Sequence, residues 1–254
     1  LAPAVALCEG RIAVAEAMLR EYLKQHPTDV AAIRMLAEVA ARLGRFVDAE
    51  HLLQRCLELA PGFHAARHNL ATVLHRQNKA QAALGEVEAL LAIEPHNGGY
   101  QNLKAAILTR IGDYPEAIEI FAQVLQQFPR QARIWMSYGH ALKTAGRQQE
   151  AIEAYRESLS FAQQVAERDP ANSEWQLGVA MAHFYLGDAL RVQADPAGAM
   201  RELSAYRDIA RRLVERDPSN EKWRLELAYG HGNVAAILEA EGDLVGARRE
   251  LELA

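Results

Sequence analysis

Residues 111–129 contain the stretch that decides the fold, I-G-D-Y-P-E-A-I-E-I-F-A-Q-V-L-Q-Q-F-P. Gly112 is predicted to end one helix, because glycine adopts the left-handed conformation of a helix C-terminus without steric cost. A second helix is predicted to begin at Tyr114. Pro129 ends it, because proline cannot continue a helix and disfavours helical backbone at the residue before it. This stretch therefore predicts a turn followed by one bounded helix.

The same frame, meaning a turn residue, a helix and a closing proline at fixed spacing, recurs along the chain with a period of 34 residues. The turn position holds Gly10, Gly44, Asn78, Gly112 and Gly146, and the closing position holds Pro27, Pro61, Pro95 and Pro129. The middle of the second helix holds Ala15, Ala49, Ala83, Ala117 and Ala151. Asparagine is the usual substitute for glycine at a left-handed helix end. A period of this length indicates a repeat architecture, in which each helix pair buries its apolar face by stacking on its neighbours.

The repeat resembles the tetratricopeptide repeat, and the resemblance extends over nearly the whole chain. The fifth copy carries Trp135, Tyr138, Gly139, Leu142, Ala151, Tyr155 and Ser158. The second copy carries Ile33, Leu36, Ala37, Ala40, Ala49, Leu53, Cys56 and Pro61. The resemblance implies an all-α fold. It would be a right-handed α-solenoid of stacked antiparallel helix pairs, with about seven repeats and truncated terminal ones.

The repeat length changes near residue 160. The closing proline expected at position 163 arrives seven residues later, at Pro170, and the next one is Pro218, which gives a period of 48 residues. Seven residues are about two helical turns, so the apolar face keeps its direction while each helix lengthens. We therefore expect a 34-residue array over 1–160, continuous with an array of longer helices over 161–254.

The two arrays resemble different bacterial proteins. The array over 1–160, especially residues 135–148, resembles tetratricopeptide arrays found ahead of bacterial sulfotransferase domains. The array over 161–254 resembles the long repeats of large bacterial signalling proteins. One natural bacterial protein containing both and an engineered fusion of two arrays are the alternatives. No sulfotransferase domain and no phosphosulfate-binding loop follow in this sequence, so that activity is not carried over.

Composition narrows the function classes. The chain has 254 residues, half of them hydrophobic, and a formal net charge of -5. This balance argues against general nucleic-acid binding, which needs a dominant basic surface. No apolar run reaches the length of a membrane span, and the first eight residues do not resemble a signal peptide. The prediction is a cytoplasmic protein, in which Cys8 and Cys56 do not form a disulfide and Cys56 is a small buried residue.

The resemblance implies that the first helix of each repeat lines a concave groove. The residues predicted to line it are Arg34, Arg42, His68, Thr72, His75, Arg76, Asn102, Arg110, Arg133, His140 and Lys143. Three consecutive repeats carry arginine at the same position, namely Arg42, Arg76 and Arg110. Arginine suits an acidic ligand, because its planar guanidinium donates two hydrogen bonds to a carboxylate. In the alternative interpretation, these arginines are solvated and interact with helix dipoles and neighbouring carboxylates.

The function predicted from these patterns is non-catalytic binding of a protein or an acidic peptide in a basic groove. One alternative is a structural or self-assembling scaffold that forms homo-oligomers through open helical ends. Another is the repeat arm of an enzyme whose catalytic domain is absent. No catalytic residue, cofactor or metal is predicted, because His64, His68 and His75 lack further ligands at a convincing spacing.

Overall fold

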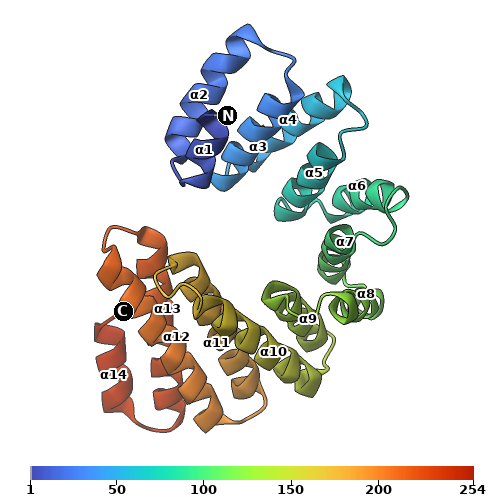
Figure 1. Ribbon diagram of the computed structural model, residues 1–254. Helices are drawn as coiled ribbons and strands as arrows, with labels where there is room; N and C mark the ends of the chain where they lie inside the picture. Colours follow the sequence, from blue (N-terminus) through green and yellow to red (C-terminus); the bar gives the residue numbers. More distant parts are fainter. Residues whose placement is uncertain (1) are drawn as a thin grey trace. The chain divides into compact units, whose positions relative to one another are not determined.

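The computed structural model describes residues 2–254, and the fold of these residues is entirely α-helical (Figure 1). The first eight helices are α1 (Ala2–Cys8), α2 (Ile12–Gln25), α3 (Val30–Arg42), α4 (Phe46–Leu59), α5 (His64–Arg76), α6 (Ala80–Leu91), α7 (Gly98–Ile111) and α8 (Tyr114–Gln127). They are followed by α9 (Ala132–Thr144), α10 (Gln148–Ala166), α11 (Ser173–Val192), α12 (Pro196–Arg216), α13 (Glu221–Ala240) and α14 (Leu244–Glu252).

The chain forms two compact units, residues 1–120 and residues 121–254. Within each unit, helices that follow one another in sequence pack together, and first helices of successive pairs also touch, as α3 touches α5 and α9 touches α11. This arrangement of stacked helix pairs confirms the predicted all-α solenoid.

The turns confirm the predicted frame. Gly44, Asn78 and Gly112 have φ angles of 74°, 64° and 99°, in the left-handed region. Gly112 ends α7, and its backbone N–H donates to the carbonyl of Leu108 at 2.9 Å. Ala194 takes the same conformation, with a φ of 62°, at the corresponding turn between α11 and α12. The frame therefore depends on a left-handed residue even where the sequence offers no glycine or asparagine.

The core of the first unit combines the small alanines that recur in the second helices with large apolar side chains. Ala49 and Ala83 are completely buried and belong to one apolar cluster with Leu53, Leu70 and Ile107. Cys56 is also completely buried and free, as predicted, and its Sγ donates to the backbone carbonyl of Val30 at 3.3 Å. The core thus fixes the spacing between the helices that carry the candidate site.

The second unit contains longer helices. α9 has 13 residues, whereas α11, α12 and α13 have 20, 21 and 20. Their core includes Val179, Tyr206 and Leu213. Aspartates cap the second helices, since Asp195 accepts from the N–H of Gly198 at 2.8 Å and Asp243 is placed in the same way. In the described part of the chain, no helix has both the length and the apolar character needed to cross a membrane.

Candidate peptide-binding groove

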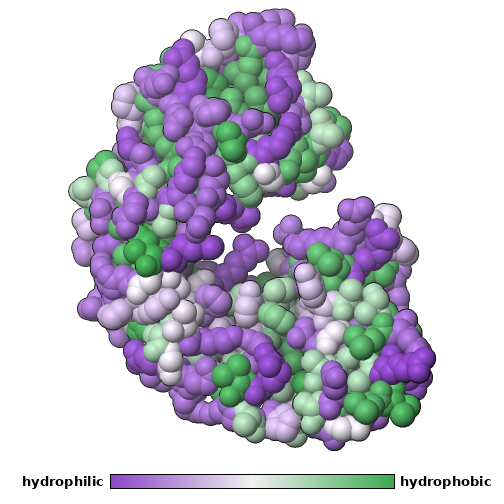
Figure 2. All heavy atoms as spheres, turned by 180° about the vertical axis from the view of Figure 1, so that it is seen from behind, coloured by the Kyte–Doolittle hydropathy of each residue, from purple (hydrophilic) through white to green (hydrophobic). Residues whose placement is uncertain are grey.

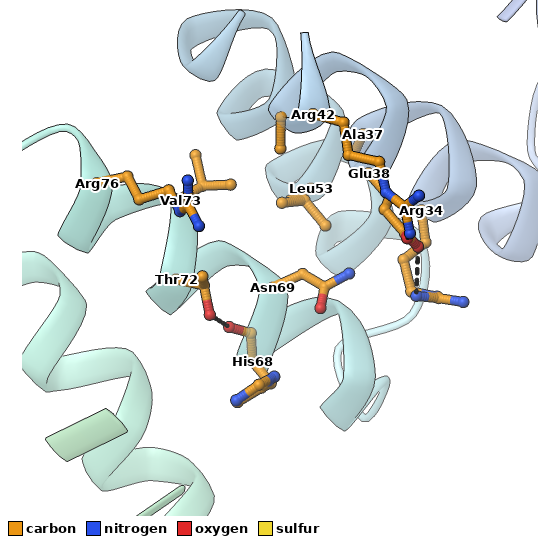
Figure 3. A pocket seen from close by; sticks show the side chains of 11 residues that line it. Arg34, Ala37, Glu38, Arg42, Leu53, His68, Asn69, Thr72, Val73 and Arg76 are labelled. Atoms are coloured by element: carbon orange, nitrogen blue, oxygen red, sulfur yellow. Dashed lines mark hydrogen bonds and ion pairs between the residues drawn. The ribbon is translucent and has the colours of Figure 1, made fainter. Parts of the chain in front are cut away.

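A groove of about 390 Å³ lies between α3 and α5 in the first unit (Figure 3). Its α3 wall is Arg34, Ala37, Glu38, Ala41 and Arg42, its α5 wall is His68, Asn69, Thr72, Val73 and Arg76, and Leu53 of α4 also lines it. Five of the residues predicted from the sequence therefore come together here, namely Arg34, Arg42, His68, Thr72 and Arg76. The groove combines an apolar floor with cationic and amide-bearing walls.

The α3 wall carries two arginines and one carboxylate. Arg34, Glu38 and Arg42 follow at four-residue intervals, which places them on one face of the helix. The Arg42 Nη2 donates to Glu38 Oε1 at 2.6 Å, and its Nη1 donates to the carbonyl of Leu7 at 3.3 Å. Arg34 Nη1 lies 3.9 Å from Glu38 Oε2. Glu38 thus neutralises one of the two positive charges on this wall.

The α5 wall has a cation of a different kind. The Arg76 side chain is exposed, and its guanidinium carbon lies 6.0 Å from the centroid of the Phe46 ring, an arrangement that orients a cation without neutralising it. Among residues 2–254, no carboxylate forms an ion pair with Arg76. Of the cations that line the groove, Arg76 is therefore the one best able to bind a ligand carboxylate.

The polar neighbours of Arg76 on α5 are uncharged. Thr72 Oγ1 donates to the backbone carbonyl of His68 at 3.0 Å, and the His68 ring centroid lies 5.4 Å from that of Tyr100. Burial lowers the pKa of His68, so this imidazole is neutral at neutral pH. Together with the Asn69 amide, these groups offer hydrogen bonds and no net charge.

Three further predicted residues belong to the first unit but do not line this groove. His75 lies near the end of α5, with Asn102 and Arg110 on α7. Burial lowers the pKa of His75, and the positive charges of Arg110 and Arg76 lower it further. Within the described residues, His75 Nδ1 and Asn102 Oδ1 are buried without hydrogen-bond partners. Arg110 thus lies outside the lining of the α3–α5 groove, and its positive charge acts on the half-buried His75.

The remaining three predicted residues lie on α9 in the second unit. Arg133 and His140 are exposed, and the His140 ring lies 6.2 Å from that of Tyr185. Lys143 is half-buried and forms an ion pair with Asp188 of α11, which also accepts from Arg191 Nη2 at 2.7 Å. Burial acts to raise the pKa of Asp188, but the bonds from Lys143 and Arg191 outweigh it and leave the pKa below its usual value. The charge of Lys143 is thus compensated within the unit.

A second hollow, of about 440 Å³, lies between α11 and α13. Its lining is Arg191, Ala194, Pro196, Ala236, Ile237, Ala240 and Glu241. This site is mainly apolar and carries one charge of each sign. Figure 2 shows that hydrophobic patches also alternate with hydrophilic ones on the surface in that view.

Sequence reasoning missed Phe46, which orients Arg76, and the pairing of Lys143 with Asp188. Phe46 is the first residue of a second helix, outside the positions expected to face the groove, so no sequence signal marked it. The spacing of Arg34, Glu38 and Arg42 at one-turn intervals was a usable signal that Glu38 would hold both arginines. No cluster of three His, Cys, Asp or Glu side chains that could hold a metal ion occurs among the described residues.

Comparison with known sequences decides the family. Sequence models described as tetratricopeptide repeat match residues 6–55 and 40–107, and another of the same description matches 102–173. These matches span more than half of the chain. The chain belongs to the tetratricopeptide repeat family.

Two curated relatives are repeat proteins of greater length. The chain is 29% identical over 120 residues to "Small glutamine-rich tetratricopeptide repeat-containing protein 2" of Mycosarcoma maydis, which covers 47% of this chain and 32% of the relative. It is 26% identical over 138 residues to "TPR repeat-containing protein YpiA" of Bacillus subtilis, covering 54% and 31%. The chain thus spans about a third of the length of either relative.

A solved structure of similar fold is that of PilW, described as a type IV pilus biogenesis factor. It has a TM-score of 0.64 and 14% identity, and the match covers 89% of this chain and 94% of PilW. At this identity the likeness shows the fold alone. The tetratricopeptide arrangement of the groove-lining helices is therefore supported by both sequence and structure.

Proposed function

We propose that this repeat array is a non-catalytic binding scaffold that holds an acidic segment of a protein in the α3–α5 groove. The observation that carries the proposal is the state of Arg76. Its exposed guanidinium lines a groove of about 390 Å³, and Arg76 lacks an ion-pair partner among the described residues. A ligand carboxylate would supply the partner, since guanidinium and carboxylate form strong bidentate hydrogen bonds. The proposal retains the cytoplasmic location predicted from the sequence.

The groove is suited to an extended peptide rather than to a small molecule. Its walls come from two neighbouring helices whose spacing is set by a buried core, so the ordering cost of binding falls mainly on the ligand. The apolar floor at Ala37, Leu53 and Val73 would accept an aliphatic side chain beside the carboxylate. Asn69 and Thr72 would provide hydrogen bonds to the peptide backbone.

The test is binding of a fluorescent hexaglutamate peptide to the full chain at low and high salt. We expect Arg76→Gln to weaken binding about tenfold at low salt, because a charge-assisted bond is lost, and salt to weaken the wild type by screening. The matched control is Arg55→Gln, which removes an exposed arginine of α4 that pairs with Glu58 at 2.9 Å outside the groove. Equal binding by both variants, or no binding by the wild type, would contradict the proposal.

Self-association is a second candidate function, favoured by one observation. The last helix and the residue after it expose several large apolar side chains, namely Leu244, Val245, Leu251 and Leu253. Burying such residues against a second copy would stabilise a dimer. Sedimentation of the wild type and of Leu251→Glu over a range of concentrations tests it: association that the substitution abolishes supports this candidate, and a concentration-independent monomer rejects it.

A further inference from the structure

The two units carry an internal carboxylate at the same position of the repeat. Glu38 precedes the left-handed residue Gly44 by six residues, and Asp188 precedes the left-handed residue Ala194 by six. The other first helices carry Ala4, Thr72, Ala106, His140 and Ala236 at this position. A carboxylate there is therefore not required by the repeat frame, and it faces the side of the helix on which a ligand is expected.

Glu38 binds the cations of the α3 wall in the manner expected of a ligand carboxylate. One of its oxygens accepts from Arg42 at 2.6 Å, and the other lies 3.9 Å from Arg34. Figure 3 shows the three side chains gathered on one wall of the groove, with Arg76 on the other. Glu38 lines the groove itself, so an acidic peptide must either share these arginines with it or bind away from them.

Asp188 of the second unit is likewise bound by two cations, although one of them comes from a neighbouring helix. It accepts from Lys143 of the neighbouring first helix α9 and, at 2.7 Å, from Arg191 one turn further along α11. Lys143 was predicted from the sequence as a groove cation, and the structure gives it an internal partner. At both sites, one carboxylate is held between two cations.

We propose that Glu38 determines the specificity of the α3–α5 groove by acting as an internal competitor for the ligand carboxylate, and this inference rests on the proposed function. Glu38 directs a ligand carboxylate to Arg76 and disfavours peptides that place a second carboxylate against the α3 wall. The ligand class is thus an acidic peptide with a single carboxylate at the α5 wall and a neutral group facing Glu38. Asp188 has the equivalent effect on Lys143 and Arg191.

The experiment compares Glu38→Gln with Glu58→Gln in the full chain, with fluorescent hexaglutamate as the probe at low salt. Both substitutions remove one negative charge, but Glu58 is an exposed residue of α4 that pairs with Arg55 and does not line the groove. A unit charge about 5 Å from the ligand at the surface predicts roughly fivefold tighter binding for Glu38→Gln. Glu58→Gln should change binding less than twofold.

Four outcomes decide the matter. Tighter binding by Glu38→Gln alone supports the inference. Equal gains in both variants overturn it, because net charge then explains the effect. Weaker binding by Glu38→Gln also overturns it, because Glu38 would then position Arg42 for the ligand. If Arg76→Gln binds the probe as tightly as the wild type does, or if the wild type does not bind it, the proposed function fails as well. This result differs from the other outcomes, so failure of the inference can be distinguished from failure of the proposed function.

Discussion

The two units build the same frame and present different chemistry at the position two residues before each left-handed turn. In the first unit this position holds Cys8, Arg42, Arg76 and Arg110, whereas the second unit has Thr144, Val192 and Ala240 there. The hollow of the second unit is accordingly lined by Ile237 and Ala240, where the first unit has Val73 and Arg76. The difference shows that exposed residues in the last turn of each first helix can be charged or uncharged. The left-handed turn residue and the buried core are sufficient to maintain the repeat.

Both units contain ion pairs between their helices, but different residue types form them. In the first unit, Glu16 pairs with Arg45 and Glu50 pairs with Lys79, each at 2.6 Å and each joining one helix pair to the next. In the second unit a histidine of the first helix pairs with a glutamate of the second. The contacts are His183 to Glu202 at 2.8 Å and His231 to Glu250 at 2.7 Å. The second unit thus has a histidine–glutamate contact within each of these two helix pairs, and Arg207 of α12 also joins one pair to the next through Glu250 of α14 at 2.8 Å.

The largest effect should come from the close helix packing of the second unit. A Cβ on Gly230 would lie 2.8 Å from the Cα of Arg207, which is backbone and cannot move aside cheaply. We expect Gly230→Ala to lower the free energy of unfolding by about 2 kcal/mol, as overpacking does. Urea denaturation of the full chain would measure it.

Two other glycine substitutions are the controls for this comparison. A Cβ at Gly232 of the same helix, or at Gly85 of α6 in the first unit, meets nothing within 4 Å. Both alanine variants should be neutral or slightly stabilising, since alanine favours helix over glycine. A stable Gly230→Ala variant would show that α12 and α13 pack less closely than described.

The ion pair at Glu50 should make the first unit sensitive to acid. The hydrogen bond from Lys79 lowers the pKa of Glu50, burial opposes this, and the bond from Gln77 adds to it. A depressed folded-state pKa stabilises the protein above the unfolded value and loses this contribution as the pH falls through the folded one. Glu50→Gln should therefore cost about 1 kcal/mol at pH 7 and almost nothing near pH 3.

Unfolding by urea at both pH values, with Glu58→Gln as the exposed control, would measure this difference. An equal loss of stability for Glu50→Gln at pH 7 and pH 3 would mean that packing rather than the ion pair explains the effect.

A smaller effect should distinguish the turns of the two units. Ala194 holds a left-handed conformation that costs an alanine about 1 kcal/mol, whereas Gly44 adopts it freely. Ala194→Gly should thus raise the midpoint of thermal unfolding slightly, and Gly44→Ala should lower it. Calorimetry of the two variants would measure both shifts, and shifts of the same sign would contradict the account.

The sequence was sufficient for the frame because the frame depends on local chemistry. A left-handed residue, a closing proline and a buried alanine at fixed spacing predicted helices that the structure contains, including α8 from Tyr114. The seven-residue delay at Pro170 likewise preceded helices of about 20 residues. The division into arrays at residue 160 stays a prediction, and the boundary of the compact units lies at 120/121.

The candidate site was predictable only in part. The resemblance to the tetratricopeptide repeat placed Arg34, Arg42 and Arg76 toward one groove, but it carried no information on how side chains from different repeats would pair. Lys143 meets Asp188, a residue 45 positions away, through the spacing of two helices that lie in different repeats of different length. Phe46 reaches Arg76 from a second helix for the same reason. Such contacts depend on three-dimensional packing, so a one-dimensional period cannot reveal them.

The most direct test of the central claim is to map where an acidic peptide binds. Backbone amide chemical shifts of the isotope-labelled full chain would be followed by NMR during titration with hexaglutamate at low salt. The account predicts that the largest shifts fall on Arg34–Arg42 and His68–Arg76, and that Arg76→Gln reduces them. Largest shifts in α13 or α14, or an unchanged pattern in the variant, would contradict it.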